Sequence, residues 1–151
     1  MLNMKWCPKC PDTATLALRL TVGITFLMHG SQKAFGAFGG GGIDGVTGFV
    51  TQLGFPMPMV MAHVLAYTEF LGGLGLILGA FTRFWAFLLS IVMVVAIFTV
   101  HLKNGFFADK GGFEFPFVIL GSCLALFFTG CNKWGMDCTI LHKWCGGSCK
   151  K

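Results

Sequence analysis

Polar and ionisable side chains interrupt several apolar stretches of this sequence at similar distances from their ends. Ionisable groups inside a membrane are costly, so each of them suggests a function. The residues that could share one layer are His29, Gln32, Lys33, His101, Asn104 and Glu114. Imidazole, amide and carboxylate groups exchange hydrogen bonds and relay protons, which suits the carbonyl oxygens of a quinone head group near a membrane interface. The alternative is that these side chains only extend their polar ends from the helix ends towards water.

Three further charged residues lie deeper in these stretches: Arg19, Glu69 and Arg83. An unpaired buried charge is costly, and the long side chain of Arg19 could reach Glu69 across neighbouring helices. The sequence therefore predicts an intramembrane ion pair between Arg19 and Glu69, with Arg83 in the same group. Such a pair would either take part in chemistry or fix the register of the bundle.

Six cysteines stand near the two ends of the chain, at Cys7, Cys10, Cys131, Cys138, Cys145 and Cys149. The segment from Cys7 to Cys10 is typical of a zinc-binding turn, and tetrahedral sulfur ligation suits zinc or iron. In a reducing compartment stable disulfides are disfavoured, which favours a metal site. Disulfides, free thiols and a redox-active pair remain alternatives, because spacing alone does not separate them. A seventh cysteine, Cys123, lies inside an apolar stretch and is interpreted as packing.

The elements that carry these residues are predicted to be membrane helices. The chain has 151 residues, of which 55% are hydrophobic and 11% charged. A soluble domain usually carries about 25% charged residues, so this composition suits lipid better than water. The predicted fold is an all-α integral membrane bundle of four helices, with spans at about 13–35, 57–79, 82–102 and 115–131. The first span is the least apolar, and a signal peptide is the alternative interpretation of it.

Loops and tails divide the chain around this bundle. Residues 1–12 form a cysteine-containing tail, residues 13–131 the membrane domain and residues 132–151 a cysteine-rich tail. A glycine-rich loop is expected over 36–45, because each glycine disfavours a helix by about 1 kcal/mol relative to alanine. Residues 46–55 are predicted to form a short amphipathic helix at the membrane interface. Gly75 and Gly79 form a small-residue pair, which favours close helix packing within the chain over a dimer face.

The basic residues predict the orientation in the membrane. With four spans, both termini and the turn at 81–83 share one side, which carries seven Lys and Arg residues against three on the other. Because basic loops stay on the cytoplasmic side, both termini are predicted to be cytoplasmic. The net charge of +5 does not indicate a nucleic-acid partner, since no basic stretch is interleaved with aromatic residues.

Three motifs follow one another in the chain within about residues 16–130. They are Arg19 to Gly36, centred on His29-Gly30-Ser31-Gln32-Lys33; Glu69-Phe70-Leu71-Gly72-Gly73 to Gly79 with Thr82-Arg83; and His101-Leu102-Lys103-Asn104-Gly105 with Gly112 and Glu114. Together they resemble the DoxX-like family of membrane proteins. The resemblance implies a four-helix fold in the inner membrane of a prokaryote. It also implies association with membrane redox complexes, since subunits of quinol oxidase and of thiosulfate:quinone oxidoreductase belong to the family.

Three functions follow as hypotheses. The first is a subunit of a respiratory or sulfur-linked redox complex that interacts with quinone. The second is a non-catalytic accessory subunit whose cysteine-rich tails, which depart from the family pattern, bind zinc or iron and brace a larger complex. The third is a thiol–disulfide membrane oxidoreductase that uses Cys7 and Cys10. The expected partners are the lipid bilayer and other subunits; a homo-oligomer, and catalysis by this chain itself, are left open.

Overall fold

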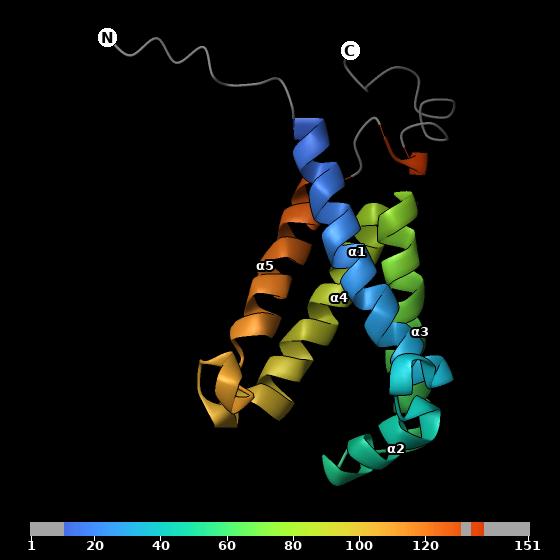
Figure 1. Ribbon diagram of the computed structural model, residues 1–151, viewed down its shortest axis with the longest axis vertical. Coiled ribbons are helices and arrows are strands. Elements are labelled where there is room, and N and C mark those ends of the chain that lie inside the picture. The colour runs from blue at the N-terminus through green and yellow to red at the C-terminus, as the bar shows by residue number, and fades with distance from the viewer. Residues whose placement is uncertain (1–10, 131–133, 138–151) are drawn as a thin grey trace.

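The computed structural model describes residues 11–130 and 134–137, and this part of the chain contains helices and no strand. Its α-helices are α1 (Pro11–Phe35), α2 (Gly42–Gln52), α3 (Pro58–Leu78), α4 (Thr82–Ala96) and α5 (Glu114–Thr129) (Figure 1). A π-helical turn, Ile97–His101, and a 3-10 turn, Leu102–Asn104, continue α4, and two more 3-10 turns lie at Ala37–Gly39 and Ala108–Lys110. The all-α class predicted from the sequence is confirmed.

Two of the described helices are long and apolar enough to cross a membrane. They are α3 and the continuous segment from Thr82 to Asn104 that begins with α4. The apolar helix α5 is shorter, with 16 residues. α1 has 25 residues, and the charged side chains of Arg19 and Lys33 lie within it. The described residues therefore contain two clear candidate membrane spans, flanked by one shorter and one more polar helix.

The four long helices run up and down between two ends of the molecule (Figure 1). At one end, which we call the tail end, α1 begins, α3 turns into α4, and α5 finishes. At the other, the loop end, lie α2 and the connection between α4 and α5, residues 97–113. α1 packs along α3, and α4 packs along α5. The two helix pairs lie close together at the tail end and diverge towards the loop end.

Glycines bring α1 and α3 into close contact. A Cβ atom at Gly30 would overlap the backbone of Phe70, and a Cβ atom at Gly73 would overlap the backbone of Leu27. Small residues at such positions let two helix backbones approach each other closely. No larger side chain fits at these points, so the glycines fix the antiparallel register of α1 against α3.

The glycines near the end of α3 also serve contacts within the chain. Trp85 of α4 occupies the space that a Cβ at Gly75 would need, and Arg19 of α1 occupies the corresponding space at Gly79. Gly79 has a φ of +67°, a conformation that glycine adopts without the strain of a larger residue. Both residues of the predicted small-residue pair are thus used inside the chain.

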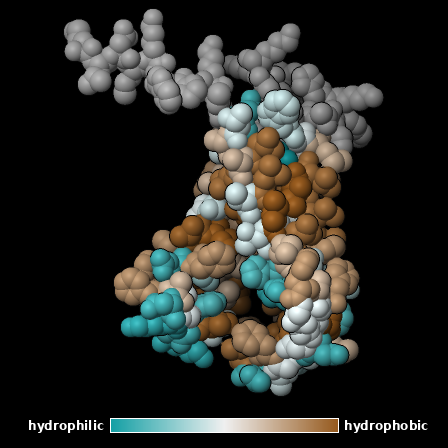
Figure 2. Space-filling model, viewed as in Figure 1, coloured by the Kyte–Doolittle hydropathy of each residue, from teal (hydrophilic) through white to brown (hydrophobic). Residues whose placement is uncertain are grey.

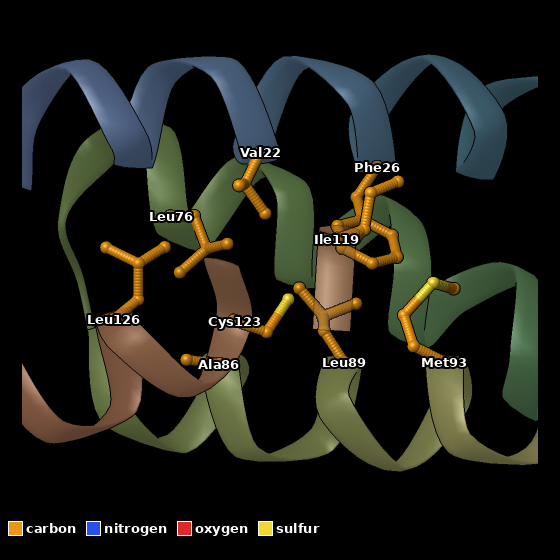
Figure 3. Close-up of a cluster of buried hydrophobic side chains, with 9 residues drawn as sticks. All are labelled: Val22, Phe26, Leu76, Ala86, Leu89, Met93, Ile119, Cys123 and Leu126. Carbon is orange, nitrogen blue, oxygen red and sulfur yellow. The ribbon is translucent and has the colours of Figure 1, made fainter. Parts of the chain in front are cut away.

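The apolar core joins all four long helices (Figure 3). Its buried members are Val22, Phe26, Leu76, Ala86, Leu89, Met93, Ile119, Cys123 and Leu126. Cys123 is a free, buried thiol inside this cluster, in agreement with its interpretation as packing. Large apolar side chains such as Phe87 and Ile91 are also exposed on the outer face, and Figure 2 shows apolar residues gathered over the middle of the molecule. Helices that are apolar inside and outside are typical of proteins surrounded by lipid.

The loop-end connections differ from the prediction in two details. α2 begins at Gly42, inside the stretch predicted as a glycine-rich loop, and ends at Gln52 instead of continuing to residue 55. α2 packs against α3 and buries Val50, and this tertiary contact offsets the low helix propensity of its glycines. The π-helical turn at Ile97–His101 has no signal in the sequence that periodicity could detect, although such turns are frequent at functional sites.

Candidate functional site

An ion pair between Lys33 and Glu69 links α1 and α3, with 2.5 Å between Nζ and Oε1. The Glu69 side chain is 2% exposed and that of Lys33 is 30% exposed. The second carboxylate oxygen of Glu69, Oε2, is buried and has no hydrogen-bond partner among the described residues. Buried polar atoms are nearly always hydrogen-bonded, so an exception calls for an explanation. This pair is therefore the first candidate for chemistry.

The structure corrects the partner predicted for Glu69, because Arg19 binds elsewhere on α3. The buried guanidinium of Arg19 donates from Nε to the carbonyl oxygen of Leu76 at 2.9 Å and from a terminal nitrogen to that of Ile77 at 3.0 Å. These carbonyls lie in the last turn of α3, at the negative end of the helix dipole, where the carbonyl of Leu76 also accepts from the N–H of Gly79 at 3.2 Å. At 1.5 Å per residue they lie about 10 Å beyond Glu69 along α3. The register set by the glycines places Lys33, and not Arg19, beside Glu69.

Arg83 also lies apart from Glu69. It stands in the first turn of α4 at the tail end, where its side chain is exposed and lies against the backbone of Gly130 at the end of α5. The predicted group of three charges is therefore divided, with Arg19 and Arg83 towards the tail end and Glu69 near the middle of α3.

Asp137 holds the start of α4, a role that the sequence analysis missed. Its carboxylate accepts hydrogen bonds from the backbone N–H groups of Phe81 at 2.6 Å and Thr82 at 2.9 Å. Its own N–H donates to the carbonyl of Gly79 at 2.9 Å. A helix cap normally comes from the residue next to the helix. Because Asp137 lies far along the chain from α4, no local pattern could have identified it.

Three of the predicted site residues fold the connection between α4 and α5. Gly111 O lies 2.8 Å from His101 Nδ1 and accepts a hydrogen bond from Asn104 Nδ2 at 3.2 Å, while Glu114 Oε2 accepts one from the N–H of Ala108 at 2.9 Å. A carbonyl oxygen can only accept, so we assign the hydrogen of His101 to Nδ1. In the neutral ring, Nε2 is then the atom left to accept a hydrogen bond. The side chains of Asn104 and Glu114 have a structural role, and His101 is the one of the three with a second ring atom to offer.

The remaining predicted residues, His29 and Gln32, lie on α1 beside the ion pair. Helical spacing places His29 and Lys33 on the stripe of α1 that carries Val22 and Phe26 into the core. His29 is exposed, in the region beyond Phe26 where the helix pairs diverge. Figure 2 shows this face of the molecule hollowed between α2 and the connection between α4 and α5. Gln32 is half-buried on the same turn of α1.

An aromatic cluster joins α1 and α3 on another face of the two helices, since residues one or two positions apart on a helix do not share a face. The ring of Phe35 meets those of Tyr67 and Phe70 edge to face, with centroid distances of 6.4 and 5.1 Å, and His63 stacks on Tyr67 at 6.2 Å. Phe70 directly follows Glu69, and Phe35 lies two residues after Lys33. Aromatic faces of this kind pack favourably against flat rings. The loop-end half of α1 and α3 thus carries the ion pair on one face and exposed aromatic rings on another.

The predicted metal ligands lie outside the described residues. This applies to Cys7, Cys10, Cys131, Cys138, Cys145 and Cys149. Within residues 11–130 and 134–137, no group of three or more His, Cys, Asp or Glu side chains could hold a metal ion. Zinc or iron at the tails remains a prediction.

Comparison with known proteins gives the family. The sequence model of the DoxX family matches residues 14–102, a segment that contains His29, Lys33, Glu69 and His101. A Bacillus subtilis (strain 168) protein named "Putative oxidoreductase CatD" is 32% identical over 83% of this chain and 86% of its own length. Two uncharacterized proteins of Haemophilus influenzae are 37% and 30% identical, over 74% and 59% of this chain and 72% and 61% of their own lengths.

No solved structure matches the chain. The family model matches more than half of the sequence, and the Bacillus subtilis relative is 32% identical over most of both chains. The chain therefore belongs to the DoxX family, a family of membrane proteins.

Proposed function

We propose that this DoxX-family protein is a membrane subunit of a respiratory or sulfur-linked redox complex and that it binds a quinone-type ligand at the loop end. The observation that carries the proposal is the Lys33–Glu69 pair, whose buried carboxylate holds a partly exposed ammonium group. The name of the Bacillus subtilis relative supports the redox class.

The ammonium group of Lys33 fits a ligand that carries carbonyl oxygens. Lys33 has three N–H donors, and one of them is bonded to Glu69, so the others are suited to a carbonyl oxygen. When bound, a quinone supplies reversible electron and proton transfer. The contribution of this chain is to orient the ring, with Lys33 as donor and Glu69 holding the ammonium in place.

Binding of this ligand is tested on the full chain purified in a mild detergent. Solvent extraction should recover quinone or quinol in an amount that approaches one per chain, and a short-tailed quinone should bind saturably. Lys33→Gln should lower the retained amount, whereas Lys110→Gln, in the exposed connection between α4 and α5, should not. If the wild-type protein neither retains quinone nor binds it saturably, the proposal is wrong.

We further propose that the chain crosses a prokaryotic inner membrane four times with both termini in the cytoplasm. Support comes from the two long apolar helices, from the apolar outer face and from the excess of basic residues expected on the tail side. This orientation places the loop end outside the cytoplasm. A fluorescent reporter that matures only in the cytoplasm should fluoresce when fused after Lys151 and stay dark when inserted at Asp109; the reverse pattern would contradict the orientation.

A structural accessory role is the second candidate, and the tail end favours it. Arg19 ties α1 to α3, and Asp137 ties the segment after α5 to the start of α4, so charged residues brace the bundle there. We propose that the cysteine-rich tails at this end bind zinc or iron and dock a partner subunit. Elemental analysis by plasma mass spectrometry should find stoichiometric metal that is lost when Cys7 and Cys10 are replaced by Ser. A metal-free wild-type protein would rule out this tail site.

A further inference from the structure

We propose that the side chain of Lys33 is a gate over the Glu69 carboxylate, and that Glu69 exchanges protons with the loop end alone. The proposal goes beyond ligand binding and does not depend on which ligand the site takes. It assigns Lys33 a second role, as the side chain that must move before Glu69 becomes accessible.

The exposures of the two side chains give the order in which they are reached. Glu69 is 2% exposed and Lys33 is 30% exposed, although they form one ion pair. A reagent or a proton donor at the loop end therefore meets the ammonium of Lys33 before it meets the carboxylate. The free oxygen of Glu69, Oε2, is hidden while Lys33 holds Oε1.

The tail side of Glu69 is closed by the apolar core. Val22, Phe26, Leu76 and Leu89 are all exposed by 5% or less, and Figure 3 shows them packed together in the core. At 1.5 Å per residue, Leu76 lies about 10 Å from Glu69 along α3 in the direction of the tail end. The buried hydroxyl of Ser90 donates to the carbonyl of its own helix at Ala86 and so offers no relay to Glu69.

The titratable groups near Glu69 lie on its loop-end side, opposite the apolar core. Towards the tail end the next charged side chain on α1 is Arg19, which is bound to the carbonyls of Leu76 and Ile77. Besides Lys33, the other titratable groups of α1, α2 and α3 in the loop-end half of the bundle are His29, Asp44, His63 and Tyr67. Among the described residues, the titratable groups near Glu69 that could relay a proton to it therefore lie on the loop-end side.

The gate is tested by the rate at which a water-soluble carbodiimide, with an amine-bearing mass tag, modifies Glu69 in the detergent-solubilised full chain. Both ends of the bundle face solvent in a micelle, so the result does not depend on membrane orientation. Mass spectrometry locates the tag, the exposed carboxylate of Asp109 supplies an internal reference rate, and Glu69→Gln gives the blank. Replacing Lys33 with Ala or Gln should speed tagging of Glu69 by about tenfold or more, because the reactivity of a buried group follows how often it is uncovered. Lys33→Arg, which keeps a long cationic side chain, should stay near the wild-type rate.

Leu76→Ala is the control variant, because it removes most of a buried apolar side chain on the tail side of Glu69. It should leave tagging of Glu69 near the wild-type rate relative to Asp109. Equal tagging in wild type, Lys33→Ala and Lys33→Gln would overturn the gate. Tagging in Leu76→Ala as fast as in the Lys33 variants would overturn the one-sided path. If Lys33→Ala does not fold, the comparison of Lys33→Gln with Lys33→Arg decides the question, since both are polar side chains of substantial length.

Discussion

At the tail end of the bundle two charged side chains, one of them buried, bind backbone groups, whereas in the middle of α3 a buried carboxylate is paired with a side chain that reaches the surface towards the loop end. Arg19 binds carbonyls in the last turn of α3, and the carboxylate of Asp137 binds N–H groups at the start of α4. Glu69 instead binds Lys33 and keeps one oxygen without a partner among the described residues.

The difference lies in what each charge can still do. A guanidinium or carboxylate that completes a helix terminus satisfies groups that would otherwise lack partners, and its effect is on stability. A carboxylate with a free oxygen beside a partly exposed lysine retains capacity for a ligand or a proton. Arg19 and Glu69 are both buried, so burial does not distinguish a structural charge from a reactive one. The hydrogen-bond partner of each charge does.

The largest effect is expected from a change in the register of α1 against α3, because the contacts at both ends depend on it. Gly30→Leu forces a side chain into the backbone of Phe70, so α1 must shift against α3. We expect unfolding free energy to fall by about 3 kcal/mol or more, since overpacking is costly where backbone cannot yield. Unfolding in a detergent titration measures it. Gly121→Ala is the control, because nothing lies within 4 Å of the added Cβ; it should leave stability unchanged or raise it by up to about 1 kcal/mol.

Removing the charge at the tail end should affect stability and spare the loop end. Arg19→Met keeps much of the side-chain length but removes the charged donor to the carbonyls of Leu76 and Ile77, of which Leu76 keeps only the N–H of Gly79. Hydrogen bonds from a charged donor are strong, so we expect a loss of about 2–3 kcal/mol in unfolding free energy. Quinone retention per folded chain should stay at the wild-type level. A loss of retention with unchanged stability would reverse the roles assigned to the two ends.

Asp137 provides a smaller change at the same end. Asp137→Ala removes the acceptor for the N–H groups of Phe81 and Thr82, and caps of this kind are worth about 1 kcal/mol. Asp137→Asn keeps an acceptor and should lose less. Thermal melting of the full chain measures both, with Asp109→Ala in the exposed connection as the matched control. Equal melting temperatures for all variants would mean that the segment 134–137 does not stabilise α4.

The sequence predicts the helices well and their mutual register poorly. Apolar stretches and their polar breaks place α1, α3, α4 and α5, and the ionisable residues inside them mark Lys33 and Glu69 as unusual. Which charge meets which depends on how far α1 is displaced along α3. That displacement is set by Gly30 and Gly73, whose role becomes visible only when the backbones are placed together.

The sequence could not predict contacts that short segments make with residues far away along the chain. Asp137 has no helical pattern around it, and its cap on α4 needs the end of α5 to return to the turn after Gly79. The start of α2 at Gly42 is another example, because local propensity argues against a helix there while packing on α3 favours it. In both places tertiary contacts override the local signal.

The smallest expected change in stability gives the sharpest contrast between the two ends. In Glu69→Gln the amide oxygen can still accept from Lys33, so we expect unfolding free energy to change by less than about 1 kcal/mol. The amide cannot take up a proton as a carboxylate does, and it holds the ammonium less firmly, so quinone retention should fall several-fold while Arg19→Met leaves it unchanged. Retention is measured by solvent extraction of both variants at equal folded concentration. Glu69→Gln could instead retain quinone at the wild-type level and lose stability as Arg19→Met does. The two buried charges would then have the same structural role, and Glu69 would have no role in ligand binding.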